Sequence, residues 1–206
     1  MNTIIYIIIF LLGAVPFINL SVSQEEPLTV VSNSNIGLEF KFPTSWVQED
    51  RTDIKKCDSF CNMSLKIPGD EGIIAVILNF YNLNDPLIQS GCICNTLKDF
   101  IKWEYGDPFL PQDLKSLMKD KEEIVSDKPT SIGNISGWEM ESKLNLLKGP
   151  RQTYDFWTIQ SDAGYNVLYA ADEGIQYEKY LPEVKKMIQT FEFIPIEKQK
   201  VPSFLQ

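Results

Sequence analysis

The feature that most constrains the fold is the apolar run "IIAVILNF" (Ile73–Phe80). Nearly every position in it is apolar, whereas a strand with one solvated face alternates apolar and polar residues. The run therefore predicts a strand buried on both faces. The turn-forming sequence "PGDEG" (Pro68–Gly72) joins it to "MSLKI" (Met63–Ile67), so we expect these two segments to pair.

Other segments show the period of two that is typical of strands, and three show helical features. "LEFKFP" alternates at Leu38, Phe40 and Phe42 and should end as a strand at Pro43. Further strands are expected at Leu28–Ser32, an edge strand, and at Glu122–Ser126, Gly137–Leu146, Arg151–Ser161 and Tyr165–Ala171. Helices are expected at Asn95–Gly106, capped by Asn95 or Thr96, at Pro111–Lys119, and over Tyr177–Ile194 with Pro182 in the first turn. The fold class is thus α+β: an antiparallel sheet with helices on both faces, an α/β/α sandwich.

The N-terminus is apolar and carries no charge from Thr3 to Leu20. Small residues at Ser21 and Ser23 fit signal peptidase cleavage after Ser23, although Lys and Arg are absent ahead of the run. The run is also long enough to cross a bilayer, which takes roughly 17–25 residues, so residues 1–23 are expected to be a signal peptide or an N-terminal membrane anchor; a buried core helix is the third alternative. The first two readings place the rest outside the cytoplasm, secreted or anchored to the outer face of the cytoplasmic membrane.

The composition excludes several classes of function. The chain has 19 Lys and Arg against 28 Asp and Glu, a net charge of −9, which argues against nucleic acid as a partner. It contains no His, which excludes a Ser-His-Asp triad, a Cys-His protease and His-ligated zinc or copper. Neither a phosphate-binding loop nor a dinucleotide-binding glycine motif is present. We therefore do not expect an enzyme. An enzyme with carboxylate or thiol chemistry is a third hypothesis, which no pair of carboxylates in the sequence supports.

The four cysteines form two close pairs, Cys57 with Cys61 (C-x3-C) and Cys92 with Cys94 (C-x-C). In an exported chain, an even count predicts disulfides. We expect two bridges between the pairs, with both connectivities open, each contributing about 3–4 kcal/mol by closing a loop. The alternatives are a four-thiolate site for zinc or copper(I), or free, redox-active thiols.

Three polar residues are also candidates. Asn62 and Asn134 each begin a glycosylation sequon. Asp155 lies between Tyr154 and Phe156, and it is expected to face outward at a sheet edge, with a buried ligand-binding carboxylate as the alternative.

Three segments resemble PsbP-like domains when taken in order and spacing. They are "FKFPTSW" (Phe40–Trp46), "SIGNISGWEMESKL" (Ser131–Leu144) and the stretch from Asp155 to Ile194 that ends "YLPEVKKMIQTFEFI". The likeness covers roughly Leu38–Ile194 and is greatest to exported single-domain PsbP-like proteins of archaea, including ammonia oxidisers. It divides the chain into the N-terminal segment, a polar lead-in (24–37), a PsbP-like domain (38–194) and an irregular tail (195–206).

The resemblance implies an α/β/α sandwich and a non-enzymatic role in binding or assembly. PsbP is an extrinsic subunit of photosystem II that helps retain calcium and chloride, so weak calcium binding is a further implication. The absence of His and the four extra cysteines depart from the family, and no family site residue carries over. The expected function is an exported domain that binds or stabilises a membrane-associated protein complex, with membrane contact through residues 1–23 if they are retained. The alternative is an extracytoplasmic zinc or copper carrier that uses the four thiolates.

Overall fold

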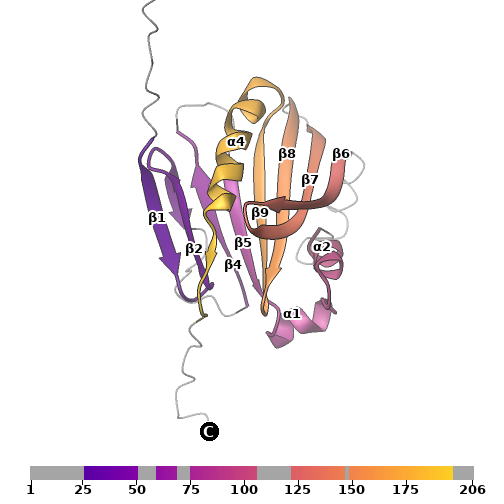
Figure 1. The fold of residues 1–206 in the computed structure, drawn as a ribbon. Helices are drawn as coiled ribbons and strands as arrows, with labels where there is room; N and C mark the ends of the chain where they lie inside the picture. Colours follow the sequence, from indigo (N-terminus) through magenta and orange to yellow (C-terminus); the bar gives the residue numbers. More distant parts are fainter. Residues whose placement is uncertain (1–25, 51–58, 69–74, 106–121, 147–148, 197–206) are drawn as a thin grey trace, which may run out of the picture.

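The computed structural model describes residues 26–50, 59–68, 75–105, 122–146 and 149–196 (Figure 1). Within these ranges no helix is both long and apolar enough to cross a membrane. The N-terminal segment 1–23 and the helix expected at Pro111–Lys119 lie outside the described residues.

The main element is a seven-stranded sheet in which every neighbouring pair is antiparallel. Its order is β3-β4-β5-β9-β8-β7-β6. The strands are β3 (Val47–Asp50), β4 (Phe60–Lys66), β5 (Ala75–Asn82), β6 (Glu122–Ile132), β7 (Ile135–Leu146), β8 (Gly149–Gln160) and β9 (Ala163–Asp172).

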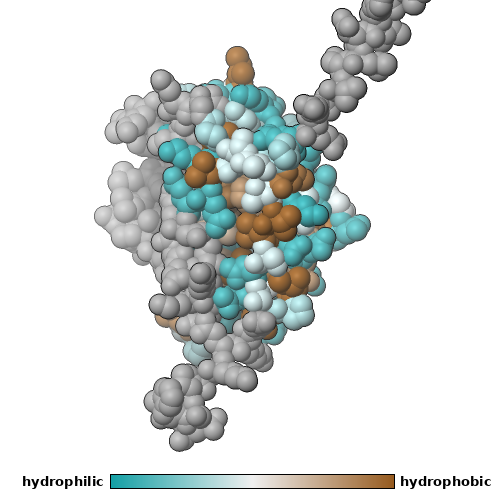
Figure 2. Space-filling model, turned by 90° about the vertical axis from the view of Figure 1, so that its left-hand side faces the viewer, coloured by the Kyte–Doolittle hydropathy of each residue, from teal (hydrophilic) through white to brown (hydrophobic). Residues whose placement is uncertain are grey.

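A smaller sheet lies beside it, at the left of Figure 1, in the order β1-β2-β10. Its strands are β1 (Leu28–Asn33), β2 (Leu38–Pro43) and β10 (Glu192–Phe193). The residues Leu38, Phe40 and Phe42 turn inward and are buried. Leu28 and Val30 of β1 instead remain about half exposed, and Figure 2 shows this side of the molecule, with apolar side chains between polar ones.

The helices are α1 (Pro86–Gly91), α2 (Leu97–Tyr105) and α4 (Ile175–Gln189). Helix α4 crosses in front of the large sheet in Figure 1, while α1 and α2 lie at its lower right. The turn of the β6–β7 hairpin reaches the C-terminal end of α4, where Gly133 lies beside Gln189.

Two apolar clusters are separated by the large sheet because its side chains alternate between faces. The larger cluster joins α4 and the small sheet to one face; on β8 it includes Tyr154 and Phe156. The smaller cluster contains Ile88 of α1, Phe100 of α2 and Trp157 of β8. The adjacent residues Phe156 and Trp157 thus belong to opposite faces.

The antiparallel α+β class predicted from the sequence is confirmed. Strand β5 differs in one respect: Val76, Leu78 and Phe80 are buried on one face, but on the other face Ala75, Ile77 and Asn79 are only half-buried and Tyr81 is buried. Helix α4 begins at Ile175, two residues before Tyr177. Pro182 therefore lies in the interior of the helix, and the prediction that it occupies the first turn is wrong. Helix α1 was not predicted at all.

Candidate functional site

Three of the cysteines are placed by the structure, and they do not converge. Cys92 and Cys94 form a disulfide with each other, with Cα atoms 5.1 Å apart. Cys61 is also disulfide-bonded, and its partner is neither Cys92 nor Cys94. Cys61 belongs to the larger cluster, whereas Cys92 and Cys94 belong to the smaller one. The predicted bridges between the two pairs are therefore wrong, because the sheet stands between the sulfur atoms.

The same separation removes the alternative four-thiolate site. Zinc or copper(I) would need the thiolates on one side of the sheet, within coordination distance of one ion. Among the described residues, no group of three or more Cys, Asp or Glu side chains could hold a metal ion. The three described cysteines therefore offer no common site for the metal-carrier hypothesis.

The Cys92–Cys94 bridge spans a separation of only two residues. On the chain-entropy model, such a small ring contributes less than the roughly 3 kcal/mol expected for a 15-residue loop. Its effect is therefore local. It restrains the connection between α1 and α2, which the structure places at one end of the large sheet (Figure 1).

Helix α1 forms because its first turn is capped. The Asp85 side chain accepts a 2.8 Å hydrogen bond from the Leu87 backbone N–H, and Pro86 occupies the start of the helix, where its missing N–H costs nothing. The helix ends where the Cys92 N–H donates to the Ile88 carbonyl at 2.8 Å. The Asp-Pro pair is the sequence signal for the start of this helix.

Helix α2 begins with a reciprocal cap, as predicted for Thr96. The Asp99 N–H donates to Thr96 Oγ1 at 3.2 Å, and the Thr96 N–H donates to Asp99 Oδ2 at 3.1 Å. The hydrogen bond from Cys92 to Ile88 ends α1, and the Thr96 cap begins α2. The disulfide restrains the connection between these two points.

A cavity of about 470 Å³ opens at this connection. Ile88, Leu97 and Ile159 contribute apolar lining from α1, α2 and β8. Cys92 and Cys94 contribute the disulfide to the wall, and Asn84, Asn95 and Asp162 add polar groups. The volume falls within the 300–1,000 Å³ that is usual for sites that accept small molecules or inserted side chains.

Two large apolar side chains stand at this end of the molecule without cover from described residues. Ile93, between the two cysteines, is 83% exposed, and Leu87 on α1 is 64% exposed. Ile93 also lines the cavity. An apolar residue held out from a restrained loop, next to an open cavity, is typical of a contact surface.

A polar layer crosses the sheet on the α2 side. Asn62, Asn79 and Asn166 lie directly opposite one another on β4, β5 and β9. The Asn79 amide donates to Asn166 Oδ1 at 2.9 Å, and Asn166 donates to Asp155 Oδ1 at 3.0 Å. Asp155 therefore lies on β8, an interior strand between β9 and β7, and the prediction that it faces outward at a sheet edge is wrong.

Helix α2 adds a second carboxylate to this layer. Glu104 accepts hydrogen bonds from Trp157 Nε1 at 2.7 Å and from the Tyr81 hydroxyl at 3.0 Å. Burial raises the pKa of Asp155 well above its usual range, and the Glu104 charge raises that pKa further, while the bond from Asn166 lowers it. Protein side chains supply all of these contacts, so the layer joins α2 to the sheet and has the character of a structural network.

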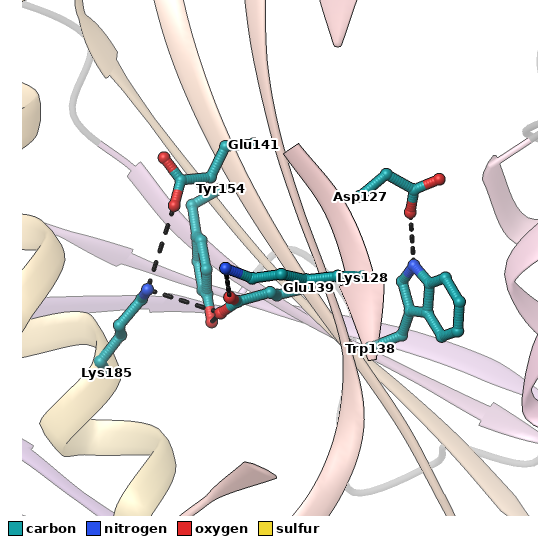
Figure 3. Close-up of polar contacts among 7 residues, drawn as sticks. All are labelled: Asp127, Lys128, Trp138, Glu139, Glu141, Tyr154 and Lys185. Atoms are coloured by element: carbon teal, nitrogen blue, oxygen red, sulfur yellow. Dashed lines mark hydrogen bonds and ion pairs between the residues drawn. The ribbon is translucent and has the colours of Figure 1, made fainter. Parts of the chain in front are cut away.

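A separate ion-pair cluster lies on the opposite face (Figure 3). The buried Glu139 of β7 lies 3.4 Å from Lys128 Nζ and 3.5 Å from Lys185 Nζ. The Tyr154 hydroxyl donates to it at 3.3 Å, and Lys185 lies over the Tyr154 ring. On the other side of β7, Trp138 donates to Asp127 of the neighbouring strand (Figure 3). The cluster ties the β6–β7 hairpin to α4.

The two sequons lie in different settings. Asn134 is exposed in the turn between β6 and β7. Asn62 lies within β4, on the face of the polar layer, and its side-chain oxygen is buried. Access for a glycan is therefore better at Asn134.

No family model matches this sequence, and no curated protein matches it either. Solved structures do match. Cyanobacterial PsbP (CyanoP) from Synechocystis aligns with a TM-score of 0.53 at 10% identity, over 81% of this chain and 92% of that chain. The Ran-binding protein Mog1p from Saccharomyces cerevisiae aligns with a TM-score of 0.50 at 7% identity, over 82% of this chain and 97% of that chain. At these identities the likeness shows the fold, and the predicted PsbP-like fold is confirmed.

Proposed function

We propose that this PsbP-fold chain is a non-enzymatic, exported binding domain that contacts a protein of a membrane-associated complex at the extracytoplasmic face. The observation that carries the proposal is the cavity at the α1–α2 connection, with Ile93 exposed at its side. A partner side chain enters the cavity, while Ile93 and Leu87 bury their apolar surface against the partner. Burial of this kind contributes about 1.5–3 kcal/mol for each large aliphatic side chain.

A binding role fits the fold and the chemistry. The fold is shared with PsbP and with a protein whose name records Ran binding. The absence of His removes the commonest general acid–base residue. The carboxylates of the polar layer accept hydrogen bonds from other side chains of the fold. Asp155 accepts from Asn166 of the neighbouring strand, and Glu104 of α2 accepts from Trp157 of the sheet.

The extracytoplasmic location is supported by two features of the chain. The uncharged apolar run from Thr3 to Leu20 fits a signal peptide or an anchor. Disulfides persist in oxidising compartments and are rare in the cytosol, so the Cys92–Cys94 bridge fits export.

Site-specific photocrosslinking in the native host tests the binding site. A photoreactive residue at position 93 should give one discrete adduct with a membrane-associated protein. The matched control is Ile175, which is 87% exposed at the start of α4, distant from the cavity. Equal adducts from positions 93 and 175, or none from either, would overturn the proposed site.

Intact mass of the protein purified from its own compartment tests the location. A chain that begins at Gln24 indicates a cleaved signal, and a chain that retains residues 1–23 indicates an anchor. In either case the cysteines should resist alkylation until they are reduced. Four thiols that alkylate without reductant would contradict the oxidising compartment.

A further inference from the structure

Strand β1 presents a backbone edge that no described residue pairs with. It stands at the end of the order β1-β2-β10 and pairs only with β2. In Figure 1 it forms the outer border of the molecule, on the side away from α1 and α2. This edge is therefore independent of the cavity and of the function proposed for it.

The register identifies which backbone groups the edge exposes. The Thr44 N–H donates to the Pro27 carbonyl at 2.9 Å, so Pro27 directs its carbonyl toward β2. Hydrogen-bonded residues alternate along an antiparallel strand. Thr29 and Val31 therefore also point toward β2, and the N–H and C=O groups of Leu28, Val30 and Ser32 point away from it.

The far side of β2 supports this assignment. Lys41 pairs with Val30. Its N–H donates to Thr190 Oγ1 at 2.8 Å, in the direction away from β1. A residue whose backbone turns away from its partner strand belongs to a non-hydrogen-bonded pair, so the backbone of Val30 also turns away from β2.

The edge lacks the devices that usually prevent strands from pairing. Edge strands are commonly protected by charged residues, especially Lys, or by Pro. Strand β3, at one edge of the large sheet, carries Glu49 and Asp50, and β6, at the other, carries Lys128 and Pro129. By contrast, the chain has no charged residue from Leu28 to Leu38, although its net charge is −9.

We infer that β1 is a homodimerisation edge, which pairs antiparallel with β1 of a second copy of this chain. A two-fold axis at Val30 sets Val30 opposite Val30, and Leu28 opposite Ser32, of the two copies. Each of these pairs exchanges two main-chain hydrogen bonds, so every free N–H and C=O of the edge is used. The two small sheets then form one continuous sheet.

The uncharged, self-matching register of β1 favours a second copy as the occupant. Two chains of net charge −9 repel one another over most approaches, but this register brings together only uncharged residues of β1. The acidic residue nearest to the N-terminal end of β1 is Glu26, and in this register it lies opposite Ser34 of the second copy. Val30 and Leu28, which are 54% and 53% exposed, gain cross-strand cover on the outer face.

The experiment combines sedimentation velocity and amide hydrogen exchange on the chain as purified, over about 1 to 500 µM. We expect a monomer–dimer equilibrium. With rising concentration, the amides of Leu28, Val30 and Ser32 should gain protection, while those of Thr29 and Val31 are protected throughout. A control protein variant is not needed for this readout, because the two sets of amides alternate in one strand.

Substitution tests the same edge. Val30→Lys places two like charges opposite each other and should weaken dimerisation at least about tenfold. The matched control is Val47→Lys, because Val47 is a 51% exposed valine on the edge strand β3. A chain that stays monomeric at the highest concentration, or an equal loss with both variants, would overturn the inference. A monomer whose β1 amides become protected only with another protein would show that a partner's strand occupies the edge instead.

Discussion

Trp157 Nε1 donates a 2.7 Å hydrogen bond to Glu104 Oε2, and this contact joins the interior strand β8 to helix α2. Trp157 is 1% exposed, so the bond forms in a site with little access to water. Helix α2 forms one wall of the cavity, so this contact also positions the candidate binding site.

Replacement of Trp157 by Phe should lower the free energy of unfolding by about 2–3 kcal/mol, because the part-buried Glu104 carboxylate loses its hydrogen bond from the buried indole N–H. Denaturant unfolding measures the change. The control is Trp138→Phe, since Trp138 donates to the exposed Asp127 and its loss should cost less than about 1 kcal/mol. Equal losses would mean that the ring volume, and not the hydrogen bond, determines the effect.

The raised pKa of Asp155 should make stability fall with rising pH. Below the pKa of about 3.9 that Asp has in an unfolded chain, both states hold the proton. Above it, the unfolded chain ionises first while the folded chain stays protonated, so the free energy of unfolding decreases until the raised folded-state pKa is passed. Asp155→Asn should be more stable than the natural protein at neutral pH and should lack this decrease.

Thermal unfolding from pH 4 to pH 8 measures this difference. Asp162→Asn is the control, because Asp162 is exposed in the turn that follows β8. If Asp155→Asn and Asp162→Asn give the same pH profile as the natural protein, the buried carboxyl does not control the pH dependence.

Gly164 on β9 allows Phe100 of α2 to approach the sheet. A Cβ atom at position 164 would lie 2.6 Å from the Phe100 ring. Gly164→Ala should therefore destabilise the fold by about 1–3 kcal/mol, as overpacking does. The double variant Gly164→Ala with Phe100→Leu should lose less free energy of unfolding than the sum of the losses of the two single variants.

Gly137→Ala is the control for that double-mutant cycle. A Cβ atom there would lie 2.4 Å from the Trp157 carbonyl oxygen and 2.6 Å from the Phe156 ring, away from Phe100. Phe100→Leu should therefore not reduce the loss of stability that Gly137→Ala causes. Additive losses in both cycles would show that α2 does not depend on Gly164 for its approach.

Tryptic peptides without reductant test the cysteine pairing. Cleavage after Lys56, Lys66 and Lys98 places Cys92 and Cys94 in one peptide, 67–98, and the other two cysteines in another, 57–66. Because Cys92 and Cys94 are joined to each other, peptide 67–98 should be free and two hydrogen atoms lighter than its reduced form. If peptides 67–98 and 57–66 are instead joined to each other by disulfides, the originally predicted bridges between the two cysteine pairs would be correct.

The sequence predicted the strands where burial follows the period of two. The alternation at Leu38, Phe40 and Phe42 matches the buried face of β2. Helix α1 was not predicted because its six residues are too few to show a helical period. The signal for its start is the Asp85 cap followed by Pro86. Asp155 was misplaced because a strand's position within a sheet is set by pairing with distant strands, which local sequence does not encode.

The candidate site could not be predicted, for a related reason. Its walls come from the end of β5, the α1–α2 connection and the β8–β9 turn, which only the folded topology brings together. The cysteine pairing depends equally on topology. Cys61 faces one side of the sheet because of its place in β4, while the α1–α2 connection lies on the other, and spacing alone carries no such information.

The pairing of β5 with β9 also dictates the order in which the chain can fold. Asn79 meets Asn166 across a separation of 87 residues, so β5 has only one neighbour until most of the chain has been synthesised. Contacts of such long range close slowly, and an unpaired apolar strand invites aggregation in the interval. The emerging chain is therefore expected to need a chaperone until β9 arrives, and any truncation before Ala163 should leave an insoluble product.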